Sequence, residues 1–150
     1  MAGKRWTSVA DRFRVFALHA ALYRLLGGRL VGRNTLLLTT TGRRSGRRRT
    51  TPVFYVRDGE DFVVISSNGG DDAYPGWWYN AQADPSVAIQ VGRNAIACDA
   101  APVKAADAAR LWPAFVAVHR GYEDYRRRTR RELSMLRLRP HGTSQRVARG

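Results

Sequence analysis

The chain has 150 residues, 44% of them hydrophobic, which is typical of a single globular domain large enough to bury a core. Its single cysteine, Cys98, excludes an internal disulfide and a cysteine-based metal cluster. The three separated histidines, His19, His119 and His141, lack the paired spacing of a zinc site, so no metal is expected. The net charge of +14 favours an anionic partner: nucleic acid, an anionic membrane surface or a polyanionic small molecule.

The first segment predicts an amphipathic helix over residues 6–26, because apolar side chains recur every three or four positions from Val9 to Tyr23. We expect residues 1–28 to form an N-terminal helix that either caps the domain or lies on an anionic membrane surface. No apolar run reaches the roughly 18 residues of a membrane span, and no signal peptide stands out. The expected location is therefore the cytoplasm, with a peripheral position at the inner face of the cell membrane as the alternative.

Strand patterns begin at residue 36 and recur to the end of the chain. The sequence Asp58-Gly59-Glu60 is typical of a hairpin turn between two of these strands, and Gly92 lies in a second turn. Pro140 ends the last pattern. The predicted strands cover residues 36–40, 50–57, 61–67, 87–91, 95–101 and 133–138.

Three further helices are predicted between these strands: a short one with Pro75 in its first turn, a longer one over residues 105–119, and a short basic one over 122–131. Pro113 marks a kink or a restart in the longer helix. This order predicts a mainly β, α+β protein: a small antiparallel barrel with flanking helices rather than a doubly wound parallel sheet. We divide the chain into the N-terminal helix (1–28), a barrel domain that binds a cofactor (29–140) and a flexible basic tail (141–150).

The most informative segment is TGRRSGRRRTTP, residues 41–52, which connects the first two predicted strands. Glycines leave backbone amides uncovered, and arginines present planar donors that match phosphate and carboxylate groups. This pattern indicates a phosphate-bearing ligand held against a sheet, or else an exposed arginine loop that keeps a sheet edge soluble. It lacks the Gly-Lys-Ser/Thr ending of a P-loop and the three-glycine dinucleotide fingerprint, so neither ATP nor NAD is favoured.

Two other segments are suited to lining a pocket. Small residues at 66–70 follow a strand and would let a flat ring approach the backbone, although they also suit a plain loop. Adjacent Trp77 and Trp78 point to different sides of a short helix, so we expect one to fill the core and the other to shield a ligand. Asn80 can hydrogen-bond a ligand or the local backbone.

Tyr122 and Tyr125 are three residues apart and share a helix face, where they either line a pocket and deliver a proton or form an ordinary amphipathic pair. No Ser-His-Asp or Cys-His arrangement is present, and the 12 acidic residues show no catalytic pairing. The chain offers groups that build a pocket rather than a catalytic triad, which favours a cofactor as the source of the chemistry.

Together these segments resemble the deazaflavin-dependent nitroreductase family, which includes quinone reductases that use reduced coenzyme F-420. The likeness runs in order over about residues 30–138. It rests on LLLTTTGRRSG at 36–46, SNGG at 67–70, PGWWYN at 75–80 and YEDY at 122–125.

The resemblance implies a split β-barrel related to the flavin-nucleotide-binding barrels, and an enzyme that transfers a hydride from reduced F-420 to an electron acceptor such as a quinone or a nitroaromatic compound. It implies that the arginine loop binds the phosphate and glutamate tail of F-420, that the deazaflavin lies near Ser67, and that two tyrosines border the acceptor. By position, the cofactor-binding residues are Arg43, Arg44, Ser45, Gly46, Arg49, Pro52, Phe54, Ile65, Ser67, Asn68, Trp77 and Asn80, and the catalytic candidates are Ser67, Tyr122 and Tyr125.

Two positions depart from the family pattern. Asn68 stands where quinone-reducing members carry Lys, and His119 stands where they carry Tyr, which implies weaker F-420 binding and a different choice of acceptor. Two alternatives stay open: a flavin- or haem-binding protein on the same barrel, and a basic nucleic-acid-binding domain, for which the chain contains no recognised motif.

Overall fold

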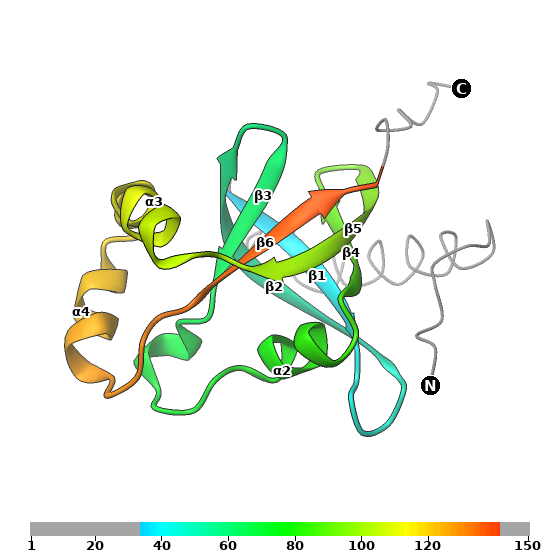
Figure 1. Ribbon diagram of the computed structural model, residues 1–150, viewed down its shortest axis with the longest axis horizontal. Helices are drawn as coiled ribbons and strands as arrows, with labels where there is room; N and C mark the ends of the chain where they lie inside the picture. Colours follow the sequence, from blue (N-terminus) through cyan, green and yellow to red (C-terminus); the bar gives the residue numbers. More distant parts are fainter. Residues whose placement is uncertain (1–33, 142–150) are drawn as a thin grey trace.

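The computed structural model describes residues 34–141, in which six antiparallel strands close into a barrel (Figure 1). Around the barrel the strands follow the order β1-β2-β3-β6-β5-β4. This arrangement confirms the predicted barrel. The strands are β1 (Thr35–Thr41), β2 (Arg48–Asp58), β3 (Asp61–Ile65), β4 (Ser86–Val91), β5 (Asn94–Pro102) and β6 (Met135–Pro140).

Within residues 34–141, three helices flank the barrel, and a 3-10 turn over Asn68–Gly70 follows β3. In Figure 1, α3 (Ala105–Val118) and α4 (Gly121–Arg128) lie together on one side of the barrel, and α2 (Gly76–Ala83) lies below it. The predicted N-terminal helix and all of the predicted tail except His141 lie outside the described residues.

The interior of the barrel is filled by side chains that alternate along each strand. Leu36 and Leu38 from β1 meet Val64 from β3 and Leu136 from β6, and all four are buried. Helix α2 packs against this core. Both Trp77 and Trp78 are buried, at 7% and 8% exposed, which confirms the prediction that at least one tryptophan of this helix packs in the core.

A second core lies between the outer face of the barrel and helices α3 and α4. Val63 and Ile65 on β3 point outward because they alternate with the inward-facing residues of that strand. They pack with Leu111 and Phe115 of α3 and with Tyr122 of α4. The two helices are thus fixed beside the end of β3, where the chain turns toward the site described below.

Every predicted strand differs from the observed one by one or two residues at one end or both. The third strand ends at Ile65 rather than at residue 67, since Asn68 adopts a left-handed conformation with φ 45° and turns the chain away from the barrel. The last strand runs from Met135 to Pro140, where Pro140 pairs with Cys98 at the edge of the ladder.

The helices also differ from their predicted bounds. The basic helix ends at Arg128 because Thr129 is extended, and its hydroxyl donates to the backbone oxygen of Asp71 instead of continuing the helix. Helix α3 continues through Pro113 to Val118, so this proline does not restart the helix.

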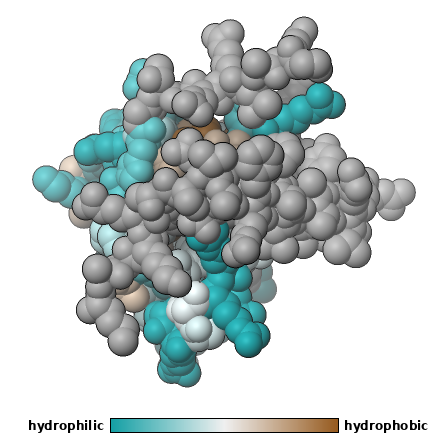
Figure 2. All heavy atoms as spheres, turned by 90° about the vertical axis from the view of Figure 1, so that its right-hand side faces the viewer, coloured by the Kyte–Doolittle hydropathy of each residue, from teal (hydrophilic) through white to brown (hydrophobic). Residues whose placement is uncertain are grey.

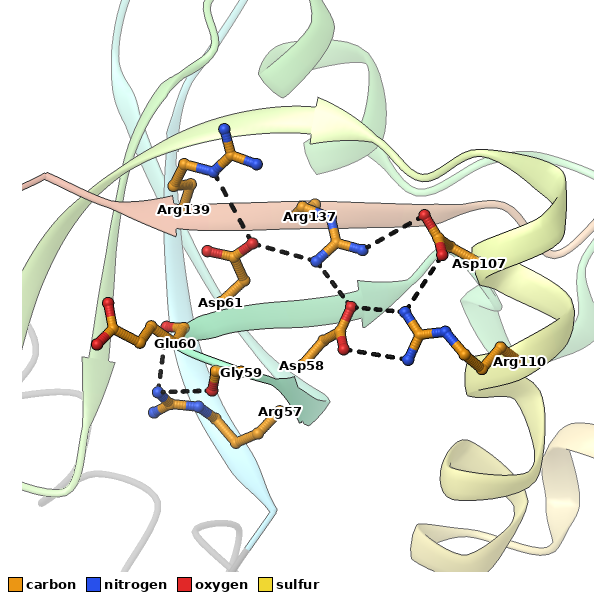
Figure 3. A network of polar contacts seen from close by, with 9 residues as sticks. All are labelled: Arg57, Asp58, Gly59, Glu60, Asp61, Asp107, Arg110, Arg137 and Arg139. Carbon is orange, nitrogen blue, oxygen red and sulfur yellow. Dashed lines mark hydrogen bonds and ion pairs between the residues drawn. The ribbon is translucent and has the colours of Figure 1, made fainter.

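An ion-pair network joins the β2–β3 hairpin to β6 and α3 (Figure 3). Arg110 of α3 donates both terminal nitrogens to Asp58, at 3.1 and 2.9 Å. Arg137 of β6 lies 2.9 Å from Asp58 and 3.1 Å from Asp61. These arginines hold the pKa of Asp58 down at about 2, with the hydrogen bond from Arg110 as the largest cause.

The described surface that faces the viewer in Figure 2 is mostly hydrophilic. Among the described helices, none has the length and apolar character needed to cross a membrane.

Candidate functional site

The arginine loop connects β1 to β2 and has a shape set by its own backbone. The Gly42 amide donates to the Arg47 oxygen at 2.6 Å, and the Gly46 amide donates to the Gly42 oxygen at 2.8 Å. Gly46 has φ +67°, and a Cβ at Gly42 would lie 2.7 Å from Ser45 Oγ. Both glycines are therefore required by the turn, whose shape is set by contacts within the loop.

Arg43 at the start of this loop is held by helix α2. The Asn80 side chain is buried, and its Oδ1 accepts from the Arg43 amide at 3.1 Å and from Arg43 Nη1 at 3.3 Å. Asn80 Nδ2 in turn donates to Thr40 Oγ1 at 3.2 Å. The Arg43 guanidinium also lies 4.9 Å from the ring centre of Tyr79. Asn80 thus positions an arginine through contacts within the protein.

A cavity of about 820 Å³ opens beside this loop. Strand β2 runs along it from Arg49 to Phe54, a span of roughly 17 Å at 3.3 Å per residue. The arginine loop therefore contributes to one end, while Phe54 and Ile65 belong to the other. The lining residues are Thr35, Gly42, Arg43, Arg44, Ser45, Arg49, Thr51, Pro52, Val53, Phe54, Ile65, Ser67, Asn68, Gly69, Tyr74, Pro75, Gly76, Trp77, Asn80 and Tyr122.

The segment that follows β3 brings backbone close to the cavity. Three successive residues, Asn68, Gly69 and Gly70, have positive φ angles of 45°, 65° and 84°. Asn tolerates this region better than other residues with a side chain, and Asn68 Nδ2 also donates to the Ala73 oxygen at 2.9 Å. These small or compact residues leave the cavity wall accessible to a flat ring.

Aromatic side chains form the far end of the site. The Phe54 ring stacks on His119 with 5.4 Å between centres, and Tyr122 meets Phe54 edge-on at 6.3 Å. His119 Nε2 and Tyr125 Oη form a hydrogen bond of 3.2 Å. Burial is the main cause that raises the pKa of Tyr122 above its ordinary value, so this phenol keeps its proton at neutral pH.

The cavity brings together all but two of the residues that the sequence predicts for the site. Gly46 does not line it and acts in the turn of the loop, and Tyr125 lies behind the wall, bonded to His119. The functional roles of the other predicted residues stay predictions.

The prediction also missed several residues that line the cavity. Gly69, Pro75 and Gly76 belong to segments that the sequence had already indicated, and Tyr74 directly precedes one of them. Thr51 and Val53 alternate with the predicted Pro52 and Phe54 along β2, so a simple inside–outside pattern assigns them to the face opposite these two residues. That face is the one on which the predicted Arg49 lies. The remaining missed residues are Thr35 and Gly42.

The fold and the cavity define a class: a small antiparallel barrel whose cavity suits an extended anionic ligand. The family of F-420H(2)-dependent quinone reductases matches residues 15–140, and the chain belongs to this family.

Individual relatives agree with this assignment. An F-420H(2)-dependent quinone reductase of Mycobacterium tuberculosis is 36% identical over 142 residues, which cover 89% of this chain and 95% of that protein. A solved structure of an F-420-H2 dependent reductase is 28% identical with a TM-score of 0.65, covering 71% of this chain and 94% of that one.

More distant structures share the fold alone. One is a putative pyridoxamine 5'-phosphate oxidase from Listeria innocua, 12% identical with a TM-score of 0.54 over 81% of this chain and 94% of that one. These comparisons confirm the split β-barrel and the resemblance stated above, and with them the expected class, an oxidoreductase that uses coenzyme F-420.

Proposed function

We propose that the 820 Å³ cavity binds reduced coenzyme F-420 and that the chain reduces a quinone there. When bound, this cofactor supplies a hydride. The proposal rests on the way the cavity lining changes along β2. Arginines line the cavity toward the β1–β2 loop, and small or aromatic residues line its other end. An extended ligand with an anionic tail and a flat ring matches this division.

The anionic part of the cofactor would be bound by Arg43, Arg44, Ser45 and Arg49. All four residues line the cavity, and the contacts that the structure gives the Arg43 guanidinium, to Asn80 and Tyr79, leave its positive charge in place. Arginine forms paired, charge-assisted hydrogen bonds with phosphate and carboxylate oxygens. The net charge of +14 adds a favourable long-range field for a polyanion.

The ring would lie against Ser67, Asn68 and Gly69, with Trp77 as a neighbouring wall. Trp77 is 7% exposed and packs edge-on against Trp78 at 6.4 Å, which fixes its position. A fixed apolar wall excludes water from the reacting atoms, a condition that hydride transfer benefits from.

The quinone would occupy the end formed by Phe54 and Tyr122. Reduction of a quinone to a hydroquinone consumes one hydride and one further proton, and the proton must reach a quinone oxygen. Tyr122 lines the cavity with its phenol as a candidate proton donor, and Ser67 is the second candidate. Tyr125 acts indirectly, through its bond to His119.

The experiment that tests this function is a titration of the purified chain with oxidised F-420, with FMN and NADPH as controls. We expect Arg44→Ala to raise the Kd for F-420 at least tenfold. Arg93→Ala removes the same charge from the exposed β4–β5 turn and is expected to leave the Kd unchanged. Binding of FMN alone would indicate a flavin-binding barrel instead. Binding of neither, with salt-sensitive affinity for nucleic acid, would indicate the basic-domain alternative.

The location of the reaction belongs to the same proposal. We place the protein in the cytoplasm, with residues 1–28 as the segment that would contact an anionic membrane. Sedimentation of the full chain with anionic and with neutral vesicles tests that contact, which requires preferential binding to the anionic ones.

A further inference from the structure

Arg131 makes an unusual set of contacts for an arginine outside the cavity. It lies between α4 and β6, and within the part of the chain that the structure describes its side chain donates only to backbone carbonyls. Nε donates to the Asp71 oxygen at 3.1 Å, and Nη2 donates to the oxygens of Ser67 and Ala73 at 3.2 and 3.1 Å. Nη1 donates to the Glu132 oxygen at 3.0 Å. One guanidinium therefore gathers three carbonyls from a single short segment.

That segment, residues 67–74, forms one wall of the cavity. It contributes Ser67, Asn68, Gly69 and Tyr74 to the lining. Its backbone is left-handed at Asn68, Gly69 and Gly70, and ordering two adjacent glycines costs backbone entropy, so contacts from elsewhere help to hold the segment in place.

The contacts of Arg131 continue into the wall itself. Its guanidinium lies 4.2 Å from the ring centre of Tyr74, and Tyr74 stacks on Trp78 of α2 with 5.4 Å between ring centres. Two neighbouring residues also bind this segment: the Arg130 amide donates to Asp72 Oδ1 at 2.9 Å, and Thr129 Oγ1 lies 3.3 Å from the same oxygen.

We propose that Arg131 is a positioning residue for cofactor binding, because it fixes residues 67–74 in the shape that receives the ring of F-420. The identity of the ligand rests on the proposed function. The clamp, by which we mean the hold of Arg131 on residues 67–74, rests only on the contacts above. Lysine cannot replace this residue, since its single ammonium cannot reach three carbonyls in one plane while stacking on an aromatic ring.

The test compares Arg131→Lys with Arg130→Lys, a matched control that keeps the charge at the exposed neighbouring position. Without any ligand, we expect amide hydrogen exchange in residues 67–74 to accelerate at least tenfold in Arg131→Lys and to stay at the wild-type rate in Arg130→Lys. We also expect the Kd for oxidised F-420 to rise at least tenfold in Arg131→Lys alone. The KM for F-420H2 should rise with it, while the KM for menadione changes less than twofold.

Two results would overturn the inference: wild-type exchange and wild-type F-420 affinity in Arg131→Lys, or equal losses in both lysine variants. A further variant, Arg131→Gln, separates charge from geometry. Weak binding by Arg131→Gln with normal binding by Arg131→Lys would show that charge alone matters and would also reject the clamp. Failure of the wild-type chain to bind F-420 would instead reject the proposed function, and the exchange rates would still decide whether Arg131 holds the segment.

Discussion

Asn80 shows how a single side chain connects the barrel to the candidate site. Its amide oxygen accepts two hydrogen bonds from Arg43, and its amide nitrogen donates to Thr40 inside the structure. A buried amide with three hydrogen bonds to two residues holds one rotamer, and its two bonds to Arg43 hold that arginine in a defined orientation. Arg43 is thus oriented by contacts within the protein, which lowers the entropy lost on binding a ligand.

We predict that Asn80→Ala weakens F-420 binding although Asn80 carries no charge. Arg43→Ala should raise the Kd about 10–100-fold, the equivalent of one charge-assisted hydrogen bond, and Asn80→Ala should raise it about tenfold. The double variant should bind no worse than Arg43→Ala, because both changes act through one guanidinium. Fluorescence titration of F-420 measures all three, and Gln82→Ala on the same helix is the control. Additive increases of the Kd in the double variant would mean that Asn80 and Arg43 act independently, and would contradict this prediction.

At this scale, sequence reasoning found residues that belong to a compact motif and missed those that act through the fold. Arg43, Ser67 and Trp77 lie in segments whose composition indicates a site, and all three line the cavity. Arg131 gave no signal, because it is one arginine in a basic stretch and its partners are backbone oxygens some 60 positions away in the chain. Contacts of that kind leave no local pattern.

Among the secondary-structure elements at the site, the 3-10 turn packs closely against α4. Gly70 has φ +84°, and a Cβ at this position would lie 3.1 Å from the Cα of Tyr125. Because the neighbour is backbone rather than a flexible side chain, α4 itself would have to move. The position of Tyr122, one turn earlier on α4, therefore depends on the absence of a side chain at Gly70.

We predict that Gly70→Ala lowers the free energy of unfolding by about 3 kcal/mol, from backbone strain and overpacking together. Gly59→Ala is the matched control: Gly59 has φ +60°, but a Cβ there meets nothing within 4 Å, so the loss should be about 1 kcal/mol. Urea denaturation of both variants gives the difference. Equal losses of stability in the two variants would mean that α4 shifts at little energetic cost and that its contact with Gly70 does not fix its position.

Hydrophobic periodicity predicted the existence of these elements well, and it failed at their ends. The strand predicted over 61–67 is two residues too long, because nothing in the composition of Ser66 and Ser67 indicates the end of a strand. In the structure the strand ends at Ile65, and the left-handed Asn68 turns the chain in a new direction. The basic helix was predicted to reach residue 131 because arginine favours helices. In the structure, hydrogen bonds from the side chains of Thr129 and Arg131 to the backbone oxygen of Asp71 override this preference.

At the scale of the whole molecule, the ion-pair network in Figure 3 joins elements that are distant in the chain. Asp58 closes the β2–β3 hairpin, Arg137 lies on β6 and Arg110 lies on α3. The network thus connects the barrel to the helix that packs beside α4, opposite the end of the barrel where α2 contributes to the cavity.

We predict that this network makes stability depend on pH in a defined window. The pKa of Asp58 falls from 3.8 to about 2 on folding, so its contribution is fully present above pH 3.8 and is lost as the pH falls toward 2. Asp58→Asn should therefore lose stability at pH 5 and show a smaller further loss between pH 5 and pH 3 than the wild type. Urea unfolding at both values measures this, with Glu60→Gln in the same turn as the control. An unchanged pH dependence in Asp58→Asn would contradict the role of the network.

Anaerobic turnover measures whether this barrel passes a hydride from F-420H2 to a quinone. The wild-type chain would be mixed with F-420H2 and menadione, and the return of the absorbance of oxidised F-420 would be followed together with hydroquinone formation. We predict one hydroquinone for each F-420H2 oxidised, at a rate that depends on the protein and falls in Arg44→Ala. Oxidation no faster than without protein, or equal rates with NADPH or reduced FMN in place of F-420H2, would contradict the proposed function.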